Sequence, residues 1–137
     1  MPLAVGATWL DQITVAGGRV VEQEWSGMWG TQIEAPLPQL VAAHWPDFTG
    51  TKVPRPISVG LLLTGDTPAA FNSLMLAVQA VVETTGTVLL TRKIETLDGF
   101  LHQTAYGVYL GGMDPTMRSH AAGVVVPRWQ MLDAEWR

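Results

Sequence analysis

Residues 55–92 constrain the fold of this chain more than any other segment, because two strand patterns flank a helix pattern there. The segment reads RPISVGLLLTGDTPAAFNSLMLAVQAVVETTGTVLLTR. Apolar residues alternate with other residues through 57–64, which predicts a strand with one face in the core. Residues 88–92 predict a second, shorter strand. This order gives a sheet a helix to cover one face, and it contains no nucleophile beside a base, no metal-ligand cluster and no phosphate loop.

The central part of this segment carries the local signals of a helix. Asp66 or Thr67 can cap the first turn, and Pro68 suits the first helical position. Apolar residues then recur at spacings of three and four, which predicts one buried stripe. The stripe consists of Phe71, Leu74, Met75, Val78, Val81 and Val82. Gly86 is expected to end the helix.

Shorter patterns on both sides of this unit predict further strands. Residues 12–22 form two β-rich runs around Gly17 and Gly18, a pair suited to a two-residue hairpin turn. Four later segments complete the expected sheet: an Asp-Gly turn at 97–100, a strand at 101–110, a loop at 111–123 and a final strand at 124–129. The sequence therefore predicts a single α+β domain over 1–137, mainly an antiparallel β-sandwich or rolled sheet flanked by one α-helix.

Residues 24–56 differ in composition from the rest of the chain. They hold five prolines, three glycines and four large aromatic side chains, with little periodicity. We interpret them as a long arm that leaves the sheet, with a short helix at 39–44. The aromatic residues Trp25, Trp29, Trp45 and Phe48 are predicted to contact another subunit. The alternative is that they pack in the core of their own protomer.

The balance of apolar and charged residues favours self-association. Apolar residues make up 47 % of the chain and charged residues 15 %, against about 25 % charged residues in an ordinary soluble domain. Interface cores are depleted in charge and enriched in Trp and Met, so a permanent homo-oligomer is the simplest account. A monomer with a rich core is the alternative. The net charge of −4 and the scattered basic residues offer no surface for specific nucleic-acid binding.

Several chemical classes lack their residues in this sequence. The chain has no cysteine, and its three histidines do not have metal-ligand spacing. Asp66, Asp98 and Asp114 each stand in a turn context, where an Asp side chain caps backbone amides. No glycine motif for phosphate binding is present. The sequence therefore predicts no catalytic residue, no metal and no organic cofactor.

A rival hypothesis places a small enzyme or ligand-binding site in the glycine-rich stretch 111–123. Asp114, Arg118 and His120 supply an acid, a cation and an imidazole there. If these three side chains converged in a closed pocket, this hypothesis would replace an assembly role.

The N-terminal residues have neither the basic region nor the long apolar core of a signal peptide, and no apolar run reaches the ~18 residues of a membrane span. We therefore expect synthesis in the cytoplasm and no membrane binding.

Four stretches carry a resemblance to a known group of proteins: VPRPISVGLLLTGDTPAAFNSLMLAVQAVV, GTVLLTRKI, TAYGVYLGG and VVPRWQMLDAEWR. Over residues 52–137 the chain resembles the distal tail and minor tail proteins of siphoviruses, especially those infecting actinobacteria. The resemblance implies a tail-tube fold and a hexameric ring around the channel through which the genome passes. The family's long loop, which reaches a neighbouring subunit, would correspond to 24–56. Many distal tail proteins carry a second, carbohydrate-binding-like domain for which 137 residues leave no room.

This resemblance implies a structural component of a long-tailed bacteriophage virion, at the distal end of the tail tube where the tube joins the tail tip. Its expected partners are further copies of itself, the adjacent tail tube and tail tip proteins, and viral DNA only in transit through the lumen. A tail terminator or another tail tube ring is the alternative, and a cellular assembly such as a contractile-injection tube is a third hypothesis. A DNA channel also predicts a lumen without strong basic patches.

Overall fold

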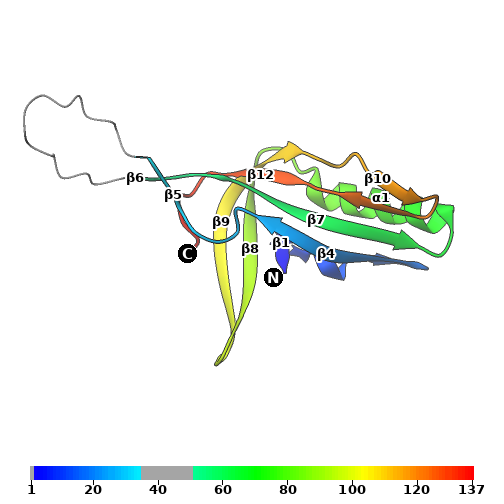
Figure 1. Ribbon diagram of the computed structural model, residues 1–137, viewed down its shortest axis with the longest axis horizontal. Helices are drawn as coiled ribbons and strands as arrows, with labels where there is room; N and C mark the ends of the chain where they lie inside the picture. Colours follow the sequence, from blue (N-terminus) through cyan, green and yellow to red (C-terminus); the bar gives the residue numbers. More distant parts are fainter. Residues whose placement is uncertain (1, 35–50) are drawn as a thin grey trace, which may run out of the picture.

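The computed structural model of this protein describes residues 2–34 and 51–137. These residues form a ten-stranded antiparallel sheet, one α-helix and a separate two-stranded sheet (Figure 1). The predicted α+β class, mainly an antiparallel rolled sheet with one helix, is confirmed. The elements are β1 (Leu3–Val5), β2 (Thr8–Trp9), a 3-10 turn (Leu10–Gln12), β3 (Thr14–Val15), β4 (Gly18–Ser26), β5 (Gln32–Glu34), β6 (Thr51–Val53), β7 (Pro56–Gly65), α1 (Pro68–Val82), β8 (Thr87–Thr96), β9 (Gly99–Gly111), β10 (Thr116–Ser119), β11 (Ala122–Val125) and β12 (Arg128–Met131).

Strand β7 lies at the centre of the large sheet. It pairs with β4 along one edge and with β11 and β12 along the other. From β12 the sheet continues through β9, β8, β1 and β2, while β10 lies outside β11. The sheet is rolled, so that β1 near one end approaches β4 near the other. The backbone N–H of Leu3 on β1 donates to the carboxylate of Glu22 on β4 at 3.2 Å.

The inner face of the roll holds the core, and α1 covers it over β7, β3 and β4. Ile57, Val59, Leu61 and Leu63 point inward from β7 and are at most 1 % exposed, as the alternation predicted. Trp129 is fully buried in the core, and its ring and that of Tyr109 meet in an edge-to-face arrangement with centroids 6.2 Å apart. Figure 1 shows α1 lying against one half of β7 while the β8–β9 hairpin projects away from the body.

The helix begins and packs as predicted, but it ends differently. The Thr67 side chain accepts a hydrogen bond from the N–H of Ala70, so Thr67 and not Asp66 is the cap. The buried stripe consists of Phe71, Leu74, Val78 and Val82, each contributing about 2 kcal/mol through burial. The prediction that Gly86 ends the helix is wrong. The helix ends at Val82, and Gly86 lies in the following turn at φ 81°.

The predicted hairpin near the N-terminus is confirmed with a shifted turn. Val15 pairs with Gly18, so Ala16 and Gly17 form the two-residue turn and Gly18 already belongs to β4. Gly17 supplies the positive φ of 74° that such a turn requires. Gly18 is needed for close approach instead, because a Cβ there would lie 2.9 Å from the Val15 side chain.

The strands on either side of the Asp-Gly turn are confirmed and run longer than predicted. Thr96 pairs with Gly99, which leaves Leu97 and Asp98 as the two-residue turn. Strand β8 continues to Thr96 and β9 spans Gly99–Gly111, so the distal half of this hairpin extends past its neighbours in the sheet.

The prediction of a loop over 111–123 is wrong. Residues Thr116–Ser119 form β10 and pair with β11 in a hairpin. All four residues of β10 are exposed, because β10 is an edge strand whose side chains do not enter the core. An edge strand of this kind shows no apolar alternation, so its sequence resembles a loop.

The predicted final strand at 124–129 is divided into β11 and β12. The division falls at Val126 and Pro127, because proline has no N–H to donate. Both strands pair with β7 in the same register. Val125 pairs with Leu61, and three residues later Arg128 pairs with Ser58, which lies three residues before Leu61. The two strands therefore form one continuous line along β7.

The predicted arm over 24–56 is shorter than expected at both ends. Residues up to Ser26 continue β4, where Trp25 pairs with Val59, and β7 already begins at Pro56. Between these limits, and within the described ranges, β5 and β6 pair with each other and with no other strand. The predicted helix at 39–44 lies outside the described residues.

Candidate functional site

The arm leaves the sheet at a cluster of aromatic and cationic side chains, which we call the arm root. It consists of Gly27, Met28, Trp29, Lys52 and Arg55 from the arm. It also includes Arg92, Gln103, Glu135 and Trp136, which contact these residues or one another. Two of the four predicted interface residues lie in or beside it. Trp25 on β4 is 40 % exposed and Trp29 is 64 % exposed. Trp45 and Phe48 lie outside the described residues, so the predicted contact of these four side chains with another subunit stays a prediction.

Arg92 is the centre of the arm root. Its side chain points inward from β8, is 8 % exposed, and lies between two indole rings. The guanidinium carbon is 5.3 Å from the ring centroid of Trp29 and 4.9 Å from that of Trp136. The same guanidinium donates to the carbonyl oxygen of Met28 and to the side-chain oxygen of Gln103. Arg92 therefore fixes the start of the arm against the sheet and the C-terminal residues.

Arg55 holds the returning end of the arm. Its Nε donates to the carbonyl oxygen of Gly27 at 2.6 Å, and its own carbonyl accepts from the N–H of Met131. The side chain is 6 % exposed, and within the described part of the chain its Nη1 and Nη2 atoms have no hydrogen-bond partner. Burial lowers the pKa of Arg55, and both burial and the charge of Arg55 lower the pKa of Arg92.

The C-terminal residues bind to the same region. Glu135 forms an ion pair with Lys52 on β6, and the backbone of Arg137 exchanges two hydrogen bonds with Thr104 on β9. Both side chains of the ion pair are about half exposed, so the pair contributes little to stability. Its main effect is to hold β6 next to the C-terminal residues. These contacts join the arm to the last residues of the chain.

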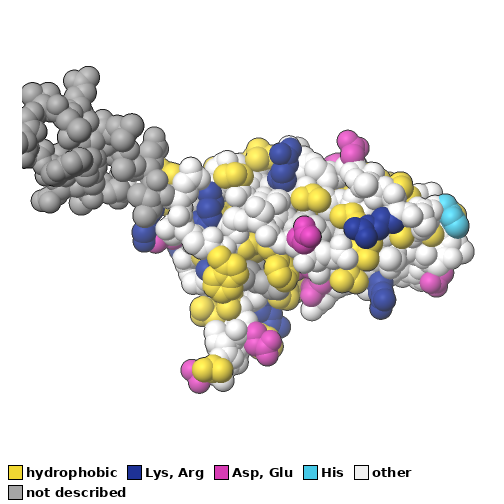
Figure 2. Space-filling view, in the orientation of Figure 1, with side chains coloured by type: hydrophobic (Ala, Val, Ile, Leu, Met, Phe, Trp, Pro, Cys, Tyr) yellow, Lys and Arg dark blue, Asp and Glu magenta, His cyan; other side chains and the backbone are white. Residues whose placement is uncertain are grey.

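A shallow apolar groove of about 310 Å³ lies beside Trp29. It is lined by Pro2, Trp29, Lys93, Ile94, Glu95 and Phe100. The ammonium of Lys93 is 4.1 Å from the ring centroid of Phe100, a cation–π contact at the rim. Figure 2 shows hydrophobic side chains gathered at the base of the β8–β9 hairpin, with charged side chains scattered singly over the rest of that face.

Glu22 is a partly buried acid next to the arm root. Its two carboxylate oxygens accept hydrogen bonds from the backbone of Leu3 and from the indole N–H of Trp25. Burial raises the pKa of Glu22 to about 7; the two hydrogen bonds lower it, and the nearby Asp11 adds a smaller increase. Glu22 therefore changes charge near neutral pH at the seam where the sheet rolls toward closure.

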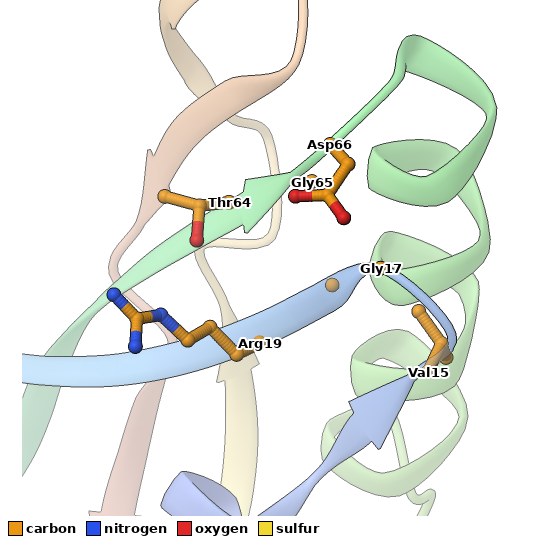
Figure 3. Close-up of a pocket in the computed structure, with 7 residues that line it drawn as sticks. Val15, Gly17, Arg19, Thr64, Gly65 and Asp66 are labelled. Carbon is orange, nitrogen blue, oxygen red and sulfur yellow. The ribbon is translucent and has the colours of Figure 1, made fainter.

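A second depression, of about 410 Å³, lies at the opposite end of β7 (Figure 3). The turn of the β3–β4 hairpin forms one wall, and Thr64, Gly65 and Asp66 form the other. In Figure 3 the guanidinium of Arg19 points away from the carboxylate of Asp66. The depression is open, and its opposite charges do not converge on a common point.

The structure does not assemble the rival enzyme site. Asp114 precedes β10, Arg118 lies on it and His120 follows it, so the acid and the imidazole stand at opposite ends of the strand. All three residues are exposed, and no hydrogen bond or ion pair between them is found. Among the described residues no group of three His, Cys, Asp or Glu side chains could hold a metal ion.

Three residues of the arm root were not predicted from the sequence as site residues: Arg55, Arg92 and Trp136. A pattern was present for one of them: residues 88, 90 and 92 alternate inward, which places Arg92 on the core side of its strand. The other two come from distant parts of the chain and carry no pattern that joins them to Arg92.

A comparison of the sequence with models of known protein families and with curated proteins gave no match. Within the ranges that the structure covers, no helix is long and apolar enough to cross a membrane.

Proposed function

We propose that this protein is a structural subunit of a long-tailed bacteriophage tail. It forms a homo-oligomeric ring, with six copies favoured, at the distal end of the tail tube where the tube joins the tail tip. A tail terminator or another tail tube ring is the alternative within the same class. The resemblance of residues 52–137 to siphovirus tail proteins supplies the biological setting, and the surface of the sheet supplies the physical support.

The observation that carries this proposal is the apolar outer face of the sheet. Leu89 on β8 pairs directly with Tyr106 on β9, and the N–H of Leu132 donates to the carbonyl of Tyr106. These three side chains form one row and are 37–48 % exposed. A second row crosses β4, β7 and β11 at Val21, Leu62 and Val124. Because α1 covers the other face, this face is available to a second copy.

The arm supports assembly for a different reason. Strands β5 and β6 extend it from the sheet as a separate ribbon, and Trp29 at its base is 64 % exposed. Exposed aromatic side chains are typical of interface centres. The arm root holds this base in one orientation, which reduces the entropy lost when a partner binds.

The basic residues bear on the proposed DNA channel. Arg55 and Arg92 are buried, so they cannot line a lumen. The other six basic residues are exposed or partly exposed and come from different parts of the fold: Arg19, Lys52, Lys93, Arg118, Arg128 and Arg137. A lumen lined by several of these six would retard DNA through phosphate contacts, and the assembled ring would then contradict a channel for DNA.

The test is the mass in solution combined with imaging. Light scattering on purified protein should give a mass of about six protomers, and negative-stain images should show rings. Leu89→Glu places a charge on the outer face and should abolish the ring. Leu76→Glu is the matched control, because Leu76 is 67 % exposed on α1, on the other side of the molecule. A wild-type monomer at high concentration, both alone and with the tail tube protein, would contradict the proposal.

A further inference from the structure

The arm root contains buried hydrogen-bond donors that have no acceptor among the residues described by the structure. Arg55 is 6 % exposed, and only its Nε is satisfied, by the carbonyl of Gly27. Its Nη1 and Nη2 atoms are buried without a partner in the part of the chain that the structure describes. A guanidinium in this situation has lost its water without regaining hydrogen bonds, a state that native proteins rarely leave uncompensated.

The charge in this region is also uncompensated. Arg92 is 8 % exposed, and its acceptors are a backbone carbonyl and a Gln side chain, both neutral. The salt bridges found among residues 2–34 and 51–137 are Lys52–Glu135 and Arg137–Asp133, and neither involves the two buried arginines. Arg55 and Arg92 are close enough for the charge of one to lower the pKa of the other. Two buried positive charges therefore share one region without a described acid.

A third donor lies in the same cluster. The indole N–H of Trp136 is buried and has no partner among residues 2–34 and 51–137, and its ring lies on the guanidinium of Arg92. The unsatisfied groups are thus all donors, and an anion with several acceptor oxygens is their chemical complement.

We propose that the arm root binds an oxyanion through the Nη atoms of Arg55, beside Arg92 and Trp136. The fork of a guanidinium matches two oxygens of a carboxylate, sulfate or phosphate. The oxyanion comes either from a free ion or from a carboxylate of a second copy. Because Arg55 holds the returning end of the arm, a bound oxyanion stabilises the arm against the sheet. This site does not depend on the proposed place in a phage tail.

The experiment follows thermal unfolding in Tris chloride while sodium sulfate replaces sodium chloride at constant ionic strength. Sulfate should raise the unfolding midpoint of the wild type with the logarithm of its concentration. At about a hundredfold excess over the dissociation constant, the ratio of folded to unfolded protein should rise about a hundredfold. Arg55→Met should not respond. Arg118→Met, which removes an exposed arginine on β10, should respond as the wild type does.

A second copy as the source gives a different result. The wild-type midpoint then rises more steeply with protein concentration than that of Arg55→Met, and sulfate has no effect on either; an equal rise in both, without a sulfate effect, comes from oligomerisation elsewhere and overturns the proposal. A wild type that responds to neither variable overturns the proposal. An equal sulfate response in Arg55→Met also overturns it, because the effect is then the general stabilisation by an ion that is excluded from protein surfaces.

Asp47 is the only acid among residues 35–50, and it provides a further control. If Asp47→Asn and Arg55→Met lower the midpoint equally and their double variant lowers it no further, the acceptor belongs to the same chain. That result also overturns an external oxyanion.

Discussion

Replacement of Glu22 by Gln should make the protein more stable at alkaline pH and leave it unchanged at acid pH. The carboxyl group lies at the seam between β1 and β4, where it accepts hydrogen bonds from Leu3 and Trp25. Burial raises its pKa from the ordinary 4.5 to about 7. Gln keeps an acceptor oxygen and a similar volume, but it has no charge to bury.

The sign and size follow from this pKa. A carboxyl group with a raised pKa in the folded state has no cost well below pH 4.5, where it is protonated in both the folded and the unfolded state. Its cost grows as the pH rises from 4.5 and is complete above about 7. The full shift of the Glu22 pKa corresponds to a loss of about 3 kcal/mol in the free energy of unfolding. Solvent access to the partly exposed side chain reduces the expected effect to about 1–2 kcal/mol.

The assay is urea unfolding followed by tryptophan fluorescence at about pH 5 and about pH 8. The free energy of unfolding of Glu22→Gln should exceed that of the wild type by clearly more at about pH 8 than at about pH 5, where only a small part of the cost is present. Glu24→Gln is the matched control, because Glu24 lies exposed on the same strand. A difference between Glu22→Gln and the wild type that is the same at both pH values would refute the reasoning.

Three further substitutions test the packing by urea unfolding. Arg92→Lys keeps the charge but loses the planar contact with two indoles, so it should lower the free energy of unfolding by about 1–3 kcal/mol. Arg128→Lys, at an exposed position, should lower it by less than about 0.5 kcal/mol. Equal losses in the two variants would contradict the stacking argument. Gly112→Ala should cost at least about 2 kcal/mol more than Gly111→Ala: both residues have a strongly positive φ, but only at Gly112 would a Cβ overlap a backbone carbonyl oxygen. Thr67→Ala removes the cap of α1 and should cost about 1 kcal/mol, with Thr67→Ser close to the wild type, and an unchanged Thr67→Ala would show that the cap is unimportant.

The sequence predicted the elements whose signals are local. The cap, the proline and the apolar stripe of α1 lie within one segment, and the alternation of β7 reflects burial of one face along its whole length. Strand β10 could not be predicted in this way, because it pairs at the edge and contributes no side chain to the core. The break at Pro127 between β11 and β12 is a local signal that the predicted strand at 124–129 overlooked.

The candidate site also has a part that the sequence suggested and a part that it did not. Aromatic residues in a proline-rich segment drew attention to Trp25 and Trp29 from composition alone, and the structure shows that both are exposed. Their contact with another subunit stays a prediction. The contacts that hold Trp29 in the arm root could not be predicted from the sequence, because Arg92 comes from β8 and Trp136 from the C-terminal residues. No periodicity connects residues that meet only when the sheet rolls.

The class of fold, the helix and the central strand could be predicted from the sequence, since the period of apolar residues and the capping residues act over a few positions. The shared burial of Arg55 and Arg92 and the contact of Glu22 with Leu3 could be seen in the folded structure alone. Burial and charge pairing are set by neighbours in space, and the antiparallel sheet brings together residues that the chain keeps far apart.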